Sequence, residues 1–115
     1  VLEDTLWILT RLGDRPVIVE PEQRAPHLVL RSHDQQAAVF GGCNRMTGSY
    51  VIDGTAIGFG HMAMTQMACP TGMETETAFA RALGAAVRYR LLAHHLELLD
   101  EDGAIVARFE ALELR

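Results

Sequence analysis

The sequence predicts a mainly β fold with one α-helix, in which a curved antiparallel sheet or barrel-like arrangement of about eight strands packs against the helix. Three observations predict it. Short apolar runs, several of them alternating with polar residues, recur along the chain. Glycine-containing turn signals separate these runs, and a single stretch repeats its apolar residues at helical spacing. We expect residues 1–115 to form one domain, because this length is ordinary for one hydrophobic core.

The first half of the chain supplies several predicted strands. Leu28 and Leu30 alternate with Val29 and Arg31, which is the period of a strand with one buried face. The dipeptide Asp53-Gly54 lies between two apolar runs and predicts a hairpin turn, since glycine tolerates positive φ. Pro70 ends a further extended segment. The strands or extended segments expected here cover residues 5–12, 17–20, 27–32, 37–43, 44–60 with its turn at 53–54, and 61–69.

One helix is predicted over residues 72–86. Thr71 and Glu74 fit a capping box, in which the threonine caps the helix and the glutamate returns the hydrogen bond. The predicted buried face consists of Met73, Phe79, Ala80, Leu83 and Val87. Three more strands follow, over residues 87–92, 95–100 and 104–114, with a turn at 102–103. Together with the helix face, Trp7, Tyr50 and Phe59 complete the predicted core.

The composition excludes several classes of function. The net charge is −5, and the ten arginines are scattered with no lysine, so the clustered positive charge of a nucleic-acid surface is missing. No apolar run approaches the roughly 20 residues that span a bilayer. No export signal is recognisable at the start of the sequence. The five histidines lack metal-ligand spacing, and we expect no cofactor.

Three methionines lie close together before Pro70. Met62, Met64 and Met67, with Cys69, offer soft sulfur ligands of the kind that bind Cu(I). Methionine is more commonly a packing residue, and we expect that role for all three.

Three stretches carry a resemblance to a known family. They are "GGCNRMTGSY" at 41–50, "MTQMACP" at 64–70 and "METETAFARAL" at 73–83, and the pattern extends to the C-terminal strands and to residues 7–9. The sequence resembles the META/HslJ family, whose members are small bacterial domains, often lipoproteins, linked to heat-shock and drug-tolerance phenotypes. The resemblance implies a compact curved β-sheet with a packed helix and no established enzymatic activity. Met46, where an aromatic residue is usual, and His61-Met62 depart from the pattern.

Cys43 and Cys69 both lie at predicted strand ends beside turn residues. They are either a disulfide or two buried thiols. Because the resembling family is exported, we expect the disulfide. A Cys-His nucleophile is disfavoured, because no histidine is placed by a motif to act as its base.

A polar link is expected beneath the helix. Glu76 lies on the apolar helix face, where a carboxylate is costly unless it is paired. Arg45 is one candidate partner, and Asn44 with backbone N–H groups is another; a donor from 42–48 or 65–68, such as Thr65, completes the set. We expect these residues to have a structural role rather than a catalytic one, since no second carboxylate shares the face with Glu76.

The family resemblance sets the functional expectation. It implies a non-enzymatic module of the bacterial periplasm or outer membrane, lipid-anchored in some full-length proteins, which supports stress or drug tolerance through protein or lipid contacts. We expect a monomer. The alternatives are a carrier of one small apolar ligand, which requires a continuous apolar cavity, and a small hydrolase, which is disfavoured because no nucleophile, base and orienting group can be assembled.

Overall fold

The computed structural model of the chain describes residues 1–112, in which one helix accompanies a ten-stranded antiparallel sheet. The helix, α1, covers Met73–Ala85. The strands are β1 (Trp7–Leu12), β2 (Arg15–Pro16), β3 (His27–Arg31), β4 (Gln36–Phe40), β5 (Arg45–Asp53), β6 (Ala56–Phe59), β7 (Ala63–Met64), β8 (Arg88–Leu92), β9 (His95–Leu99) and β10 (Ile105–Ala111). The predicted mainly β fold with one helix is therefore confirmed.

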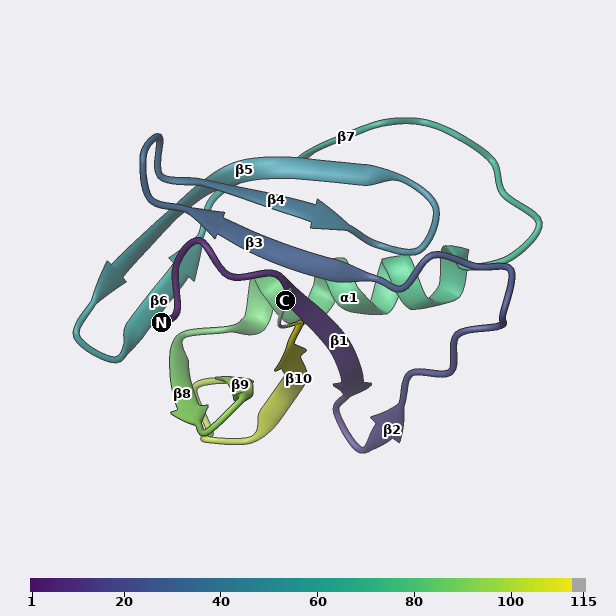
Figure 1. The fold of residues 1–115 in the computed structure, drawn as a ribbon. Coiled ribbons are helices and arrows are strands. Elements are labelled where there is room, and N and C mark those ends of the chain that lie inside the picture. The colour runs from purple at the N-terminus through teal and green to yellow at the C-terminus, as the bar shows by residue number, and fades with distance from the viewer. Residues whose placement is uncertain (113–115) are drawn as a thin grey trace.

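The sheet closes on itself as an irregular ring. Its strands follow the order β10-β9-β8-β6-β5-β4-β3-β1, and β1 pairs with β10 from Trp7↔Ala111 to Leu12↔Ala107. Two seams are short: β6 and β8 share only the pair Ala56↔Arg88, and β1 and β3 share two pairs. The ring is accordingly not a regular barrel. β2 and β7 branch from β1 and β5 (Figure 1).

Alternation along the strands separates the core from the solvent. In β3, β4 and β5, Leu28, Val39 and Met46 lie in one cross-strand row and are buried. The next row along, His27, Phe40 and Arg45, must face the opposite way because successive side chains of a strand alternate between faces. The predicted alternation of Leu28 and Leu30 is confirmed, since both are fully buried.

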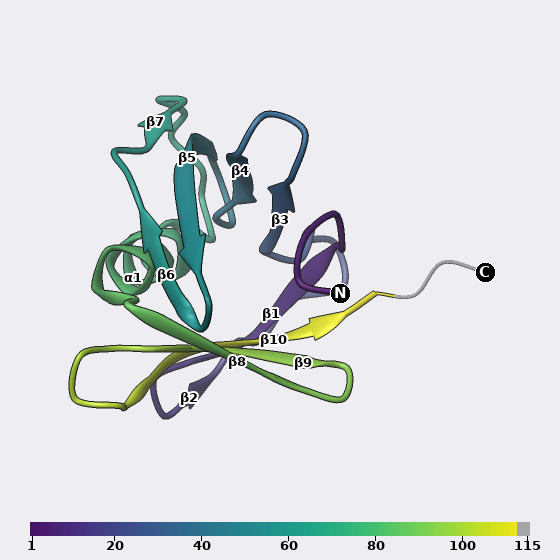
Figure 2. The ribbon, with the colours of Figure 1, turned by 90° about the vertical axis from the view of Figure 1, so that its left-hand side faces the viewer.

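Helix α1 lies beside the ring, between the β5–β6 part and the β8–β10 part of the sheet (Figure 2). Its buried residues are Glu76, Phe79, Ala82 and Leu83. Phe79 meets Phe109 of β10 with ring centroids 5.7 Å apart. The predicted helix is confirmed, but Met73 and Val87 of the predicted buried face are exposed and Ala80 is half-buried. Val87 lies beyond the helix, which ends at Ala85.

The predicted capping box is wrong. The N-cap is Gly72, with φ of 91°, and no side chain caps the helix. Thr71 instead accepts a hydrogen bond from Gln23. Glycine is required at this position because a Cβ on Gly72 would collide with the backbone of Gly42. The close approach of the two chain segments, rather than helix capping, decides the local conformation.

Several strand boundaries differ from the prediction. The apolar run 17–20 is not a strand, because β2 ends at Pro16 and the chain then leaves the sheet. Only Ala63–Met64 of the predicted segment 61–69 pairs, with Met46 and Thr47 of β5. The last predicted strand extends to residue 114, but β10 ends at Ala111 and residues 113–115 lie outside the described part of the chain. Both predicted turns are confirmed, with Gly54 and Gly103 at φ of 62° and 81°.

The interior is filled by large side chains. Trp7, Tyr50, Phe79 and Leu83 are buried as predicted, whereas Phe59 is only half-buried. The largest fully buried side chains come from both sides of the ring and from the helix: Tyr50, Phe79, Phe109, Leu9, Leu28, Leu30, Met46, Leu83, Leu96 and Leu98. This packing matters for function, because it occupies the space that an enclosed ligand would need.

Candidate functional site

Three chain segments meet at the start of α1. They are the β4–β5 turn with residues 41–44, the loop that follows β7 with residues 65–69, and the first turns of the helix with Gly72 and Glu76. We call this meeting point the junction. It contains most of the residues singled out from the sequence, so its contacts decide whether those residues are structural or chemical.

The carboxylate of Glu76 is the centre of the junction. Its side chain is buried, and it accepts hydrogen bonds from the backbone N–H groups of Cys43, at 3.1 Å, and Asn44. The Asn44 amide donates a third, at 2.9 Å. All three contacts are donors, which is the environment that a buried carboxylate needs.

Asn44 connects Glu76 to the loop after β7. Its amide nitrogen also donates to the carbonyl of Met67 at 3.2 Å. Its amide oxygen accepts from the Met67 N–H at 2.7 Å and from the Thr65 hydroxyl at 3.0 Å. Asn44 is 3% exposed, and its side-chain amide makes all of its hydrogen bonds, two donated and two accepted, inside the protein.

Arg45 enters the junction only through its backbone, whose N–H donates to the Thr65 hydroxyl at 3.0 Å. Its side chain is exposed on the other face of β5, and among the described residues its guanidinium is not one of the Glu76 donors. The structure thus brings together Asn44, Thr65 and Glu76, and it follows the alternative in which Asn44 and backbone N–H groups compensate the carboxylate.

Two glycines allow the segments to approach. A Cβ on Gly41 would lie 2.6 Å from Cγ of Glu76, and a Cβ on Gly42 would lie 2.7 Å from the carbonyl oxygen of Gly72. Both distances are below any real contact of a Cβ atom. The Gly-Gly pair of the sequence is therefore needed for close packing against the helix.

The predicted disulfide is confirmed. Cys43 and Cys69 are bonded, with Cα atoms 5.9 Å apart. The bond joins the β4–β5 turn to the segment just before the helix, directly beside the Glu76 contacts. The covalent and hydrogen-bonded links therefore hold the same three segments.

The methionines near the junction do not all pack as expected. Met62 is half-buried against the core, but Met64 and Met67 are 37% and 54% exposed. The prediction that all three are packing residues is wrong for these two, whose side chains are exposed. Among residues 1–112, no group of three or more His, Cys, Asp or Glu side chains could hold a metal ion.

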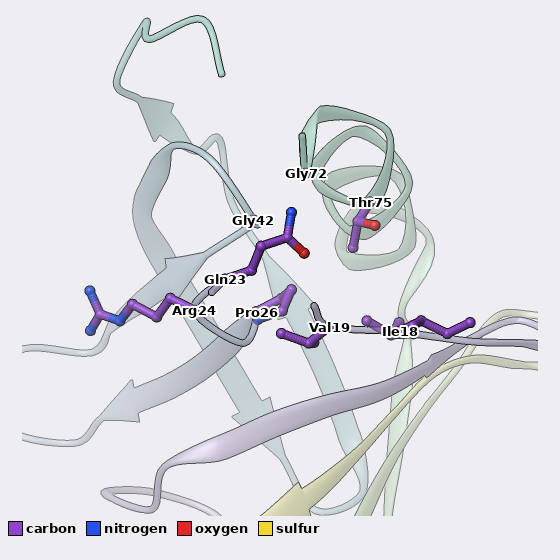
Figure 3. A pocket seen from close by; sticks show the side chains of 9 residues that line it. Ile18, Val19, Gln23, Arg24, Pro26, Gly42, Gly72 and Thr75 are labelled. Carbon is purple, nitrogen blue, oxygen red and sulfur yellow. The ribbon is translucent and has the colours of Figure 1, made fainter. Parts of the chain in front are cut away.

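A small cavity lies between the junction and the 17–26 loop. Its lining includes Val19, Gln23, Gly42, Gly72 and Thr75 (Figure 3). It encloses about 20 Å³, which is room for one water molecule and not for a substrate.

Two polar clusters were not predicted. Glu97 in β9 is 4% exposed and pairs with Arg90 at 2.6 Å, while Arg108 lies 3.8 Å away. The leucine-rich run around Glu97 gives no sign that its carboxylate faces two arginines, since that depends on the register of three strands.

The N-terminal segment carries the second cluster. Tyr50 donates a hydrogen bond to Glu3, and burial, followed by this hydrogen bond, raises the pKa of Tyr50 well above its ordinary value. Asp4 accepts bonds from the hydroxyl and the N–H of Ser32, and the hydroxyl bond is the largest cause of a lowered pKa for Asp4. These contacts fix the segment before β1 to β3 and β5.

Comparison with known proteins places this geometry in a family. The model of the META domain matches residues 1–113. The chain belongs to the META domain family. The residues of the junction are among those that carry the META resemblance in the sequence, and this META domain uses them to build its fold. A search of curated proteins found no match.

Solved structures share the META architecture. A protein from Burkholderia xenovorans, determined by NMR, is 29% identical, with a TM-score of 0.77 over 98% of this chain and 85% of the other. A second NMR structure is 19% identical, with a TM-score of 0.72 over 95% and 90% of the two chains. A DUF4847 family protein from Bacteroides vulgatus ATCC 8482 is 13% identical, with a TM-score of 0.66 over 100% and 97%. The last two show the fold alone.

The helix of the META domain is not a membrane span. Within residues 1–112, no helix has the length and apolar character needed to cross a bilayer.

Proposed function

We propose that this META domain is a non-enzymatic module of the bacterial envelope that supports stress or drug tolerance by binding a protein or lipid partner. The observation that carries the proposal is the closed junction. The residues that the family motif supplies form a disulfide and a set of polar groups that satisfy one another's hydrogen bonds. Side chains whose hydrogen bonds are already committed to one another are poor candidates for a reaction with substrate.

The disulfide supports a location outside the cytoplasm. Disulfides persist in oxidising compartments such as the bacterial periplasm and are rare in the reducing cytoplasm. The family membership is compatible with such a location. A carrier function has less support, because the core positions inside the ring are filled by fully buried side chains.

Complementation in the host bacterium tests the proposal. The gene is deleted, and survival of heat and drug challenge is measured for cells that carry the exported wild type, a form retained in the cytoplasm, or the exported Arg81→Gln variant. Arg81 is exposed on α1, away from the junction, and serves as a matched control. We expect the exported wild type and Arg81→Gln to restore survival and the retained form to fail. Equal rescue by the retained form would contradict an envelope role.

The non-enzymatic part needs its own experiment. Asn44→Ala removes the most connected polar side chain of the junction, and the variant is compared with wild type at a temperature where both are folded. We expect the folded variant to restore survival and to retain the same partner in crosslinking from intact cells. Loss of rescue by a folded, correctly localised Asn44→Ala protein would favour a chemical role for the junction.

A further inference from the structure

The outer face of β3, β4 and β5 carries a hollow that the junction does not use. Strand register places two rows side by side on this face, one of His27, Phe40 and Arg45 and one of Val29, Ala38 and Thr47. We call it the outer hollow, and the residues that matter for its chemistry are Arg24, Val29, Arg31, Ala38, Phe40 and Arg45.

The shape of the outer hollow follows from side-chain size. Ala38 is the smallest residue of its row, and Phe40 stands two residues further along the same strand, on the same face. The short side chain between larger neighbours leaves a depression with a volume of about 460 Å³, which lies in the range of small-molecule sites. Val29, Ala38 and Phe40 give it an apolar and partly aromatic part, beside the polar side chains of His27 and Thr47.

The rim of the outer hollow is positively charged. Three arginines line it, and no carboxylate of residues 1–112 does, although the chain as a whole has a net charge of −5. Arg31 is paired with Asp34 at 3.1 Å, and its Nε is buried without an acceptor in the described part of the chain. Arg24 and Arg45 are exposed, and neither forms a carboxylate pair within residues 1–112.

Arg24 and Arg45 both lie next to the same aromatic residue, Phe40. Cζ of Arg24 lies 5.3 Å from the centroid of Phe40, and Arg45 is the cross-strand partner of Phe40. Figure 3 shows the side chain of Arg24 extending away from α1 and the cavity drawn there. Because both arginines line the same hollow, an anion bound there would meet two positive charges.

We propose that the outer hollow binds small amphipathic anions. A phosphate or carboxylate group would lie between Arg24 and Arg45, because guanidinium groups bind such oxygens through paired hydrogen bonds. An apolar or aromatic body would lie over Ala38, against Phe40 and Val29. This inference goes beyond the proposed function, since it concerns a ligand site and holds whether or not the chain is exported.

Phenyl phosphate is the probe that tests the proposal, with inorganic phosphate and phenol as its two halves. Amide chemical shifts of the labelled protein are followed by NMR during each titration. We expect phenyl phosphate to shift Ala38, Phe40 and Thr47 and to bind at least tenfold more tightly than either half. Inorganic phosphate binding as tightly as phenyl phosphate would overturn the role of the apolar part.

Variants locate the binding. Arg24→Gln and Arg45→Gln change exposed side chains and keep the backbone N–H of residue 45, which donates to the Thr65 hydroxyl. We expect each to weaken phenyl phosphate binding at least tenfold, and Ala38→Leu to abolish it by filling the hollow, with melting temperatures close to that of the wild type. Arg81→Gln should change nothing. Binding that survives both arginine variants, or an equal loss with Arg81→Gln, would overturn the proposal.

Vesicles distinguish the two sources of the anion. Sedimentation with phosphatidylglycerol vesicles, but not with phosphatidylcholine vesicles, that is lost in Arg24→Gln would identify a lipid headgroup as the ligand. Phenyl phosphate binding without sedimentation would identify a soluble ligand. Absence of both would overturn the proposal.

Discussion

At the scale of single residues, the Glu76 carboxylate shows how a buried charge is accommodated without a countercharge. Its three donors are two backbone N–H groups and one amide, all from Cys43 and Asn44. An arginine at the same place would have to be desolvated as well. Neutral donors fixed by a tight turn avoid that cost, and they hold the turn against the helix.

Replacing Glu76 tests the value of these contacts. Glu76→Gln leaves one oxygen and places an NH₂ group among donors, so we expect a loss of about 2–3 kcal/mol in the free energy of unfolding. Asn44→Ala should be strongly non-additive with it in a double-mutant cycle read by urea unfolding. Arg45→Ala is the control and should cost less than about 0.5 kcal/mol. Additive losses for Glu76 and Asn44 would show that the contact contributes little.

The raised pKa of Tyr50 predicts that the protein loses stability at alkaline pH. Its pKa is raised by burial and then by the hydrogen bond to Glu3, so the folded state favours the neutral phenol. The contribution of Tyr50 to the free energy of unfolding is fully present below the pKa of the phenol in the unfolded chain, about 10. It decreases as the pH rises above that value, by up to about 1.4 kcal/mol per pH unit. Urea unfolding between pH 8 and 11 should show this decrease for the wild type and a smaller one for Tyr50→Phe. Parallel curves for the two proteins would contradict the assignment.

Residue-scale prediction from the sequence succeeded for Glu76 and left two alternatives for its partner, of which the structure follows Asn44 with backbone N–H groups. Helical spacing placed Glu76 on the buried face, because that face depends on one element alone. Arg45 was one candidate partner, but its neighbour Met46 faces the core, so Arg45 must face outward on the same strand. The strand period could have excluded the Arg45 side chain as a partner of Glu76. The backbone donors of Cys43 and Asn44, in contrast, depend on a turn geometry that residue types do not encode.

At the scale of elements, α1 is held by a narrow stripe and by its first turn. Phe79 and Leu83 are buried four residues apart, and Glu76 extends the stripe toward the junction. Met73 falls outside the stripe, although the sequence suggested it, because the helix begins with that residue and the Gly42–Gly72 contact sets the direction of entry. Apolar spacing therefore predicted the middle of the helix better than its ends.

A matched pair of leucines tests the stripe. Leu83 is 2% exposed and Leu92 is 44% exposed. We expect Leu83→Ala to lower the free energy of unfolding by about 2–5 kcal/mol, because it leaves a cavity between helix and sheet. Leu92→Ala should cost less than about 1 kcal/mol. Similar losses for both variants in urea melts would mean that the helix face is assigned wrongly.

The strands differ in how far the sequence determines them. β3 alternates cleanly and was predicted almost to the residue, since Leu28 and Leu30 face one core. The run 17–20 is equally apolar, but within residues 1–112 no strand pairs with it after β2 ends. β-propensity describes a fit to a pleated, half-buried surface, so it misleads where the surrounding sheet is missing.

At the scale of the whole molecule, the disulfide and the closed ring hold different parts of the chain together. The ring joins β1 to β10, whereas the disulfide ties the β4–β5 turn to the helix start. The disulfide closes the loop 43–69, which lies inside the longer segment between β1 and β10, and of the two restraints only the disulfide persists in the unfolded chain. The disulfide was predictable from family resemblance, whereas the sequence left a curved sheet and a barrel-like arrangement as alternatives, because closure of the ring depends on register between distant strands.

Removing the disulfide tests the second restraint. Cys43 and Cys69 are 26 residues apart in sequence, and closing such a loop is worth about 3.5 kcal/mol in the chain-entropy model. We expect the Cys43→Ala/Cys69→Ala variant to lose about this amount in urea unfolding, and wild type treated with reductant to lose a similar amount. Stability unchanged by either treatment would show that the Glu76 contacts alone hold the junction.

The pairing of β1 with β10 also sets an order in time. Trp7 pairs with Ala111, so one edge of the first strand finds its partner only when almost the whole described chain has been synthesised. Until then β1 has only the short pairings with β2 and β3 on its other side. A chain that emerges N-terminus first thus keeps an unpaired strand edge, and folding is completed by its last strand. Such an edge can pair with another chain, so the yield of folded protein depends on chaperones and on rapid release of the finished chain from the ribosome.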